Sequence, residues 1–253
     1  MRIILLIISI CVCMPSWGQP QIVEPYATTD SLDCPPVGND YRFEPRRLIA
    51  PGVMLAAGIT GIYAFKGIRR SVCGMVGGNK TIGLDRYFEF VPTVAYLGVG
   101  AIPGVISRTD IRQRLLATAT TYLIVGATVN AFKHTLHEKR PDGGNGSFPS
   151  GHTAFAFAGA ELTRIEYGNL IGTASYAVAI ATGVLRMHNN RHWINDVVGG
   201  AALGILSARI AYWLLPFERK IFRLDNSANR NRSIAIAPVM FDHGGGLALD
   251  VIF

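Results

Sequence analysis

The chain has 253 residues, of which 49% are hydrophobic and 16% are charged, whereas roughly 25% are charged in a typical soluble domain. Its formal net charge is +7 and its mean hydropathy is +0.29. The basic residues lie in short loops between apolar runs and form no continuous basic face. This pattern argues against nucleic acid as a partner and favours an anionic membrane or an anionic substrate.

Residues 1–18 have the pattern of a secretory signal peptide. The charged start Met1-Arg2 precedes the apolar run Ile3–Met14, and small residues precede a cleavage site near Gly18. An uncleaved signal anchor is the alternative, although the apolar run is shorter than a full membrane span. Residues 19–84 then form a predicted exported segment that is polar and proline-bearing up to residue 47 and contains one apolar helix.

Six apolar stretches follow the polar segment: 48–65, 90–107, 115–132, 153–163, 170–187 and 197–215. Those at 90–107, 115–132 and 170–187 are close to the roughly 17–25 residues that span a bilayer as a helix. The stretches around Glu161 and Arg209 also fit buried core helices. We therefore predict an all-α, membrane-embedded bundle of about six helices, with its catalytic part at 85–217.

Residues 218–253 form a polar, basic tail followed by two short apolar runs. The runs at 234–239 and 247–253 flank the turn sequence Asp242–Gly246, which predicts a small C-terminal β-hairpin. A single hairpin cannot close a membrane barrel, so a barrel reading carries little weight.

Three polar clusters interrupt the apolar sequence between Lys133 and Asp196. In the first, Lys133 and Arg140 lie seven residues apart, so both project from one helix face if the helix runs that far. Both side chains could then clamp phosphate oxygens, Arg140 in bidentate fashion. Taken alone, this cluster is equally a solvated basic loop beside a membrane.

The second cluster is Pro149-Ser150-Gly151-His152, which leads into an apolar helix. The N–H groups at a helix N-terminus, the Ser150 hydroxyl and the unhindered Gly151 would form an anion site. His152 at its rim could protonate a leaving alkoxide as general acid. The alternative is a helix-capping segment with an incidental histidine.

The third cluster contains Arg186, His192 and Asp196. His192 and Asp196 are spaced i, i+4, so we expect them to share a helix face. The carboxylate could then fix the imidazole tautomer and leave the other ring nitrogen free to attack phosphorus, while Arg186 contacts the phosphoryl oxygens. The alternative is a surface His–Asp pair.

Together the clusters resemble the type 2 phosphatidic acid phosphatases. That family's pattern is Lys, six residues, Arg-Pro; then Pro-Ser-Gly-His; then Ser-Arg, five residues, His, three residues, Asp. This chain has all three motifs at the same spacings, except that Leu185 replaces the usual Ser and lacks its hydroxyl. The match is specific because three individually weak motifs agree in spacing.

The resemblance implies a phosphatase that uses neither a metal nor another cofactor. His192, held by Asp196, would form a phosphohistidine, and His152 would protonate the leaving group. His152 would then assist water in hydrolysing the phosphohistidine. Lys133, Arg140, Arg186, Ser150 and Gly151 would bind the phosphate. His134 and His137 have the spacing of a metal pair, but no third ligand is evident, and a solvated helix face is the better reading.

The expected substrate is a lipid phosphate or pyrophosphate of the bacterial envelope, such as phosphatidic acid, phosphatidylglycerophosphate, undecaprenyl pyrophosphate or a lipid A phosphate. A soluble periplasmic acid phosphatase and a non-catalytic protein that binds anionic headgroups remain alternatives. A vanadium haloperoxidase does not fit so short and apolar a chain. Nothing in the sequence decides the oligomeric state.

The positive-inside rule predicts the orientation of the bundle in the inner membrane. Arginines and lysines at 108–114, 164 and 219–223 lie on the face opposite the motifs, which puts the motifs in the periplasm. That orientation requires Leu48–Phe65 to pack on the bundle or re-enter without crossing. It also permits a disulfide between Cys34 and Cys73, the two cysteines left after signal cleavage.

Overall fold

The structure is a computed structural model. It describes residues 44–78, 81–102, 105, 107–222 and 224, together with the backbone of two strands at 234–241 and 244–251. The predicted signal peptide at 1–18 and Cys34 lie outside the described residues.

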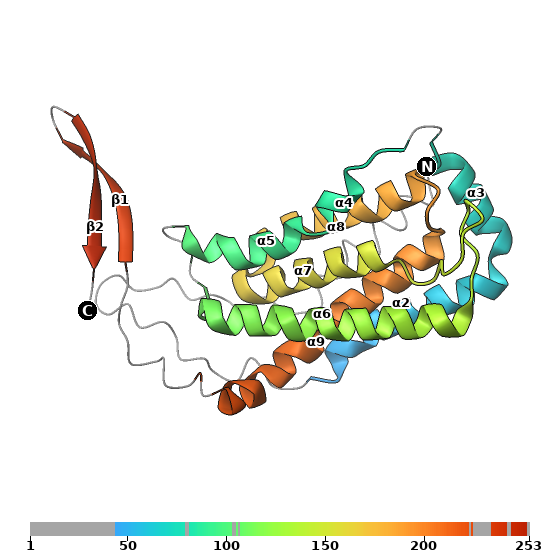
Figure 1. Ribbon diagram of the computed structural model, residues 1–253, viewed down its shortest axis with the longest axis horizontal. Coiled ribbons are helices and arrows are strands. Elements are labelled where there is room, and N and C mark those ends of the chain that lie inside the picture. Colours follow the sequence, from blue (N-terminus) through green and yellow to red (C-terminus); the bar gives the residue numbers. More distant parts are fainter. Residues whose placement is uncertain are drawn as a thin grey trace.

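Helices account for most of the described chain and lie side by side in one bundle (Figure 1). Their bounds are α2 Arg46–Ala64, α3 Lys66–Val76, α4 Asp85–Phe88, α5 Val91–Gly98, α6 Ile111–Leu136, α7 Gly151–Tyr167, α8 Asn169–His188 and α9 Ile194–Ile221, and a short 3₁₀ turn, η2 Val99–Ala101, follows α5. The predicted helical bundle is therefore present.

Helix α7 forms the centre of the bundle and packs against α5, α6, α8 and α9. Its alanines at 154, 156, 158 and 160 are fully buried. Glycines on α9 permit the close approach to α7, because a Cβ on Gly200 would lie 2.5 Å from the Ser150 carbonyl oxygen. Small residues on both helices thus bring the start of α9 directly against the start of α7.

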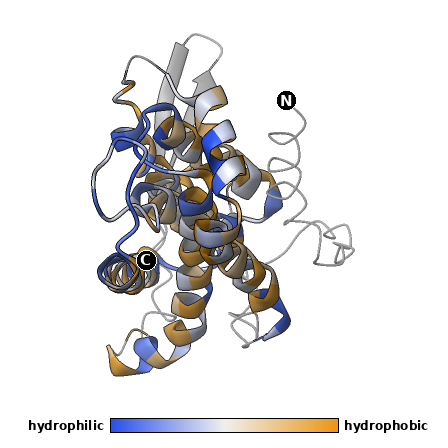
Figure 2. Cartoon of the chain, turned by 90° about the vertical axis from the view of Figure 1, so that its right-hand side faces the viewer, coloured by the Kyte–Doolittle hydropathy of each residue, from blue (hydrophilic) through white to orange (hydrophobic). Residues whose placement is uncertain are grey.

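Among the described residues, four helices, α2, α6, α8 and α9, are long and apolar enough to cross a membrane. Large apolar side chains such as Leu123 and Leu170 are exposed on their outer faces, and hydrophobic residues run along the helices in Figure 2. Water would disfavour such surfaces, whereas lipid would accept them. The bundle thus has the character of a membrane-embedded protein.

The prediction of a spanning helix at 90–107 is wrong. Helix α5 ends at Gly98, and after η2 the backbone of Ile102 is extended, with φ −79° and ψ 126°. The ring of the following residue, Pro103, disfavours a helical conformation at Ile102, so the apolar run cannot continue as one helix. The stretch at 153–163, in contrast, forms the buried core helix that its Glu161 suggested.

Helix α2 packs on α9 and is itself long and apolar enough to span a membrane, so the prediction that residues 48–65 do not cross stays a prediction. A Cβ on Gly58 would lie 3.0 Å from the backbone of Gly199, and one on Gly61 would lie 2.9 Å from the Asn195 side chain. Since residues late in α2 contact residues early in α9, the two helices run antiparallel. Helix α2 therefore ends near the start of α9, and its first residues, Arg46 and Arg47, lie toward the other end of the bundle.

Strand β1 (Ile234–Phe241) pairs antiparallel with β2 (Gly244–Val251), with Ile234 opposite Val251 and Phe241 opposite Gly244. The helical bundle alone carries the functional argument that follows.

Candidate active site

One end of the bundle gathers the termini of four helices. Helices α6 and α8 end there, and α7 and α9 begin there, because neighbouring helices joined by short connections run in opposite directions. The three polar clusters of the sequence occupy these termini. Segments far apart in the chain therefore face one pocket of about 300 Å³, lined by Thr81, Gly83, Asp85, Arg86, Arg140, His152, Arg186, Asn189 and Arg191.

Lys133 and Arg140 do not share a helix face, contrary to the prediction. Helix α6 ends at Leu136, and His137 adopts a left-handed conformation with φ 44°. A tight turn then holds Arg140, whose N–H donates to the Gly144 carbonyl at 2.8 Å. Arg140 reaches the pocket from this loop, while Lys133 is half-buried in the last turn of α6 and does not line the pocket.

The Pro149–His152 cluster begins α7, as predicted, with Ser150 as the N-cap residue. Ser150 is fully buried, and its hydroxyl pairs with the Thr153 hydroxyl at 2.9 Å. The backbone N–H of Ser150 donates to the backbone carbonyl of Asp196 at 3.0 Å. Ser150 therefore joins α7 to α9 and does not line the pocket. Gly151 opens the helix, where N–H groups have no intrahelical acceptor, and His152 reaches the pocket.

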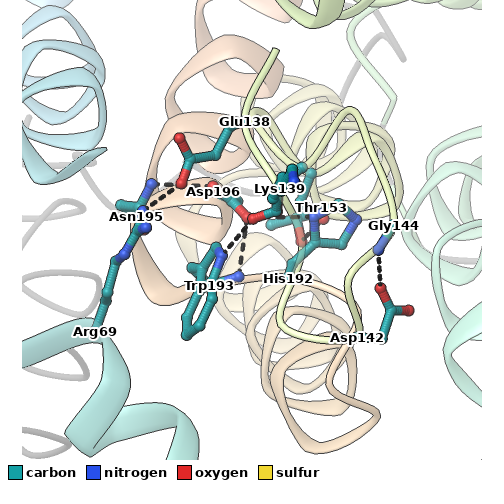
Figure 3. A network of polar contacts seen from close by, with 12 residues as sticks. Arg69, Glu138, Lys139, Asp142, Gly144, Thr153, His192, Trp193, Asn195 and Asp196 are labelled. Atoms are coloured by element: carbon teal, nitrogen blue, oxygen red, sulfur yellow. Dashed lines mark hydrogen bonds and ion pairs between the residues drawn. The ribbon is translucent and has the colours of Figure 1, made fainter. Parts of the chain in front are cut away.

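His192 and Asp196 are paired, but not on a helix face as predicted. Helix α9 begins at Ile194, so His192 precedes it, whereas Asp196 lies in its first turn. The Asp196 carboxylate reaches back and accepts the Trp193 N–H at 2.9 Å, and its Oδ2 lies 3.5 Å from His192 Nδ1 (Figure 3). An N-terminal capping interaction, which a short acidic side chain favours, thus produces the pair.

Asp196 accepts two further hydrogen bonds within the core. Asn195 donates its side-chain N–H at 3.0 Å, and the Ser147 hydroxyl makes a short hydrogen bond to Oδ2. These donors hold the carboxylate in place while its Oδ2 faces His192. Asp196 is completely buried and His192 is 2% exposed, so the ring orientation is set by the protein and not by solvent.

Arg186 lies at the end of α8 and binds Asp85, a residue that the motif analysis missed. Its Nη1 donates to Asp85 Oδ2 at 2.6 Å. Asp85 belongs to α4, and the segment before it is tied to α8 by the Asn189 side chain, which bonds both the N–H and the carbonyl of Ile82 at 2.8 Å. No sequence motif marks these residues, because their contact spans about a hundred positions of chain.

A second missed group positions the loop that carries Arg140. Arg69 donates to Glu138 at 2.5 Å and stacks over the Trp193 ring at 4.8 Å, and Trp193 Nε1 donates to the Lys139 carbonyl at 2.8 Å. Figure 3 shows this group next to Asp196. The loop between α6 and α7 is thereby anchored just before Arg140, by residues of α3 and of the chain entering α9.

The environment of the pocket shifts several protonation equilibria. Burial and the nearby Arg186 charge lower the pKa of His152 to about 4. Burial also lowers the pKa of His192, although Asp196 opposes that effect. Burial would raise the pKa of Asp85, but the hydrogen bond and charge of Arg186 outweigh it and the net shift is downward. Both histidines are thus neutral near pH 7, as a nucleophile requires.

The remaining candidates lie outside the pocket. His134 and His137 are exposed, as expected of a solvated helix end. Across the described residues, no group of three or more His, Cys, Asp or Glu side chains is arranged to hold a metal ion. The Cys73 thiol donates to Asn190 Oδ1 at 3.4 Å, and its predicted disulfide to Cys34 stays a prediction.

Comparisons with known proteins find similarity to one family model and to a curated protein. The sequence model of the PAP2 superfamily matches residues 114–220. The lipid A 1-phosphatase of Porphyromonas gingivalis is 39% identical over 135 residues, which are 52% of this chain and 30% of that protein. The chain therefore spans less than a third of that relative's length.

Two further proteins match more weakly. The bacitracin transport permease protein BcrC of Bacillus licheniformis is 24% identical over 143 residues, covering 51% of this chain and 70% of that protein. The crystal structure of Aquifex aeolicus LpxE is 21% identical, covers 56% of this chain and 92% of that chain, and has a TM-score of 0.41.

Proposed function

We propose that the chain is a member of the PAP2 superfamily, whose model matches residues 114–220, and that it is a phosphatase that hydrolyses a membrane lipid phosphate through a phosphohistidine. The observation that carries the proposal is the convergence of Arg140, His152 and Arg186 on one pocket beside the buried His192–Asp196 pair. Headgroup binding alone would need the cations but not a histidine oriented by a carboxylate.

In the first step, His192 attacks phosphorus. Asp196 faces Nδ1 at 3.5 Å, which fixes the proton on that nitrogen and leaves Nε2 as the nucleophile. Arg140 and Arg186 stabilise the phosphoryl oxygens as their charge develops. Lys133 adds a positive charge from the last turn of α6, and the N–H groups at Gly151 and His152 add donors.

The leaving alkoxide needs a proton when the bond from phosphorus to oxygen breaks. His152 lies in the pocket and supplies it as general acid. In the second step, water attacks the phosphohistidine and His152 accepts its proton. The proposed chemistry uses no metal and no other cofactor. Ser150 contributes by fixing the start of α7 against α9, and its direct contact with phosphate stays a prediction.

We propose a lipid A phosphate as the first substrate to test, because the relative with 39% identity is named a lipid A 1-phosphatase. Phosphatidic acid, phosphatidylglycerophosphate and undecaprenyl pyrophosphate are the other candidates. The four apolar helices favour a lipid substrate over the soluble substrates of a periplasmic acid phosphatase. The C-terminal hairpin and the assignment of residues 85–217 as the catalytic unit stay predictions.

We place the protein in the bacterial inner membrane with the pocket facing the periplasm. Arg46 and Arg47 begin α2 toward the end of the bundle where Arg219 and Lys220 end α9. This direction fits the positive-inside rule if α2 crosses the membrane, whereas the predicted export of residues 19–84 requires that α2 does not cross. If α2 crosses, however, Cys34 precedes it on the cytoplasmic side and cannot reach Cys73. Non-reducing mass spectrometry of the mature protein distinguishes the two arrangements, because a Cys34–Cys73 disulfide requires that α2 does not cross.

The proposed function is tested with purified protein and a panel of lipid phosphates in detergent micelles. We expect phosphate release that persists with a chelator, is inhibited by vanadate and is lost in His192→Ala. Acid quenching of the wild-type reaction with a ³²P-labelled substrate should trap label on His192. Loss of activity with a chelator, or full activity of His192→Ala, would contradict the proposal.

A further inference from the structure

Glu89 is a buried carboxyl group next to His152 that no motif includes. It lies between α4 and α5, is 7% exposed, and its Oε1 is 3.7 Å from His152 Nε2. Within the described part of the chain, no hydrogen bond to this carboxyl is present. Among the described residues, the ion-pair contact of this carboxyl is with the histidine that the proposed mechanism uses as an acid.

The other buried carboxylates of the bundle differ from Glu89. Asp85, Glu161, Glu166 and Asp196 each accept hydrogen bonds from side chains or backbone N–H groups. Such donors stabilise the ionised form, whereas a buried carboxyl without donors favours the neutral acid. Glu89 is thus placed to hold a proton, and His152 is placed to receive it.

The protonation equilibria of the two groups agree with this geometry. Burial raises the pKa of Glu89 to about 7, and it lowers the pKa of His152 to about 4. The groups that act on Glu89 are Arg186 and Arg86, which oppose the rise, and Asp85, which adds to it. The Tyr122 phenol also lies near Glu89. Below pH 7 the pair therefore carries its extra proton on Glu89.

This arrangement meets a requirement of the leaving-group step. A neutral imidazole has one N–H, and after donating it the ring would be left as an imidazolate unless its other nitrogen gains a proton. His152 Nε2 faces Glu89, which leaves Nδ1 for the substrate. A proton moving from the carboxyl to Nε2 while Nδ1 donates to the alkoxide keeps the ring neutral throughout.

We propose that Glu89 acts through His152 as the proton source for the departing alcohol, an inference that rests on the proposed phosphatase function. As the bond from phosphorus to the leaving oxygen breaks, Nδ1–H protonates that oxygen and the Glu89 carboxyl protonates Nε2, becoming a carboxylate. When water later attacks the phosphohistidine, its proton goes to Nδ1 and the Nε2 proton returns to Glu89. Each turnover therefore restores both groups.

The test compares leaving groups that need a proton with one that does not. Single-turnover release of the alcohol is measured for a long-chain alkyl phosphate and for 4-nitrophenyl phosphate in wild type, Glu89→Gln and Glu89→Asp. The amide has the shape of the acid but cannot supply the proton. We expect Glu89→Gln to slow the alkyl substrate roughly 10–100-fold while the aryl substrate changes less than about threefold. Glu89→Asp should recover part of the loss.

Glu218→Gln is the matched control. Glu218 is a partly buried carboxylate near the end of α9 that accepts the Thr120 hydroxyl at 2.6 Å, so its variant should match wild type with both substrates. Wild type should also lose rate on the alkyl substrate as the pH rises through about 7, and Glu89→Gln should lack that decline.

Equal losses on both substrates in Glu89→Gln, or an unchanged pH profile, would overturn the role of Glu89 while leaving the phosphatase assignment intact. The phosphatase assignment instead fails if wild type releases no phosphate from any lipid, or if His192→Ala stays active. The two failures are therefore distinguishable in the same set of assays.

Discussion

Two regions around α7, one at its start and one farther along it, contain the same kinds of charged residues but use them for different purposes. Near the start of α7, Arg140, His152 and Arg186 line a pocket, and among the described residues the buried Nε atoms of Arg140 and Arg186 have no hydrogen-bond partner. Farther along, Glu161 is fully buried and accepts hydrogen bonds from Arg164, Tyr176 and Arg209. Both regions contain buried charge, but only the second is saturated, in the sense that its buried carboxylate is surrounded by hydrogen-bond donors.

The difference shows how to separate structural from functional charge in an apolar bundle. A buried carboxylate with cations and hydroxyls on all sides joins helices together, because its desolvation is offset within the protein. Glu166 is similar, since it accepts from Thr109 and Tyr212. Cations that converge on a pocket and keep unpaired N–H donors instead form a site for an anion that binds from solution or the membrane. The pairing of each group, more than its residue type, distinguishes the two cases.

The largest effect is expected at the proposed nucleophile. His192→Ala should lower kcat for lipid phosphate hydrolysis by at least about 10³-fold, because the covalent route is lost and only substrate positioning remains. Phosphate release per folded molecule measures it, with thermal unfolding in detergent as the check on folding. A loss below about tenfold would show that His192 is not the nucleophile of the phosphatase reaction.

The next effect concerns the contact between Arg186 and Asp85. Arg186→Lys should lower kcat/KM roughly 10²-fold, because lysine keeps the charge but cannot bind Asp85 and phosphate oxygens together. Asp85→Asn alone should cost less, and in the Arg186→Lys background it should add under about twofold, as expected of coupled groups. Equal effects of Asp85→Asn in both backgrounds would show that Asp85 does not position Arg186.

The saturated region should respond in stability instead of activity. Glu161→Gln should lower the free energy of unfolding by about 3 kcal/mol, because it leaves two partly buried guanidinium groups without their buried carboxylate. Glu44→Gln removes an exposed pair with Arg47 and should change stability by under about 0.5 kcal/mol. Chemical unfolding in mixed micelles measures both, and kcat per folded molecule should match wild type. A loss of kcat in Glu161→Gln would erase the contrast between the two regions.

The smallest effect is a pH dependence of stability at the pocket. The folded protein keeps a proton on Glu89 up to about pH 7, whereas an unfolded glutamate loses it near 4.5, so this group lowers stability as the pH rises through that window. His152 acts in the opposite sense, because the unfolded histidine gains a proton below 6.5 and the folded one only near 4.

The variant Glu89→Gln separates the two contributions. Its stability relative to wild type should increase between about pH 5 and about pH 8, and the difference in Tm measured across that range tests the sign. A constant difference would mean that Glu89 is ionised throughout and that the pocket end is as saturated as the Glu161 region.

Motif spacing predicted three polar clusters that the structure brings together, but it did not predict their local backbone structure. The three clusters meet at one end of the bundle, yet Lys133 and Arg140 are separated by the left-handed His137, and His192 precedes α9. Spacing in sequence is compatible with several backbone paths, so it could identify the participants without giving their conformations. Apolar length alone likewise mistook residues 90–107 for a span, because it ignored the effect of Pro103 on Ile102.

The sequence by itself indicated the helical class, the resemblance to the PAP2 superfamily and the candidate histidines, cations and carboxylate of the three motifs, because composition and fixed spacings are local properties of the chain. Only the tertiary structure decided which charges are paired and which are available. Asp85 binds Arg186 across 101 positions, and Glu89 faces His152 across 63. Such contacts depend on how helices pack, and burial, which sets protonation, exists only once they have packed.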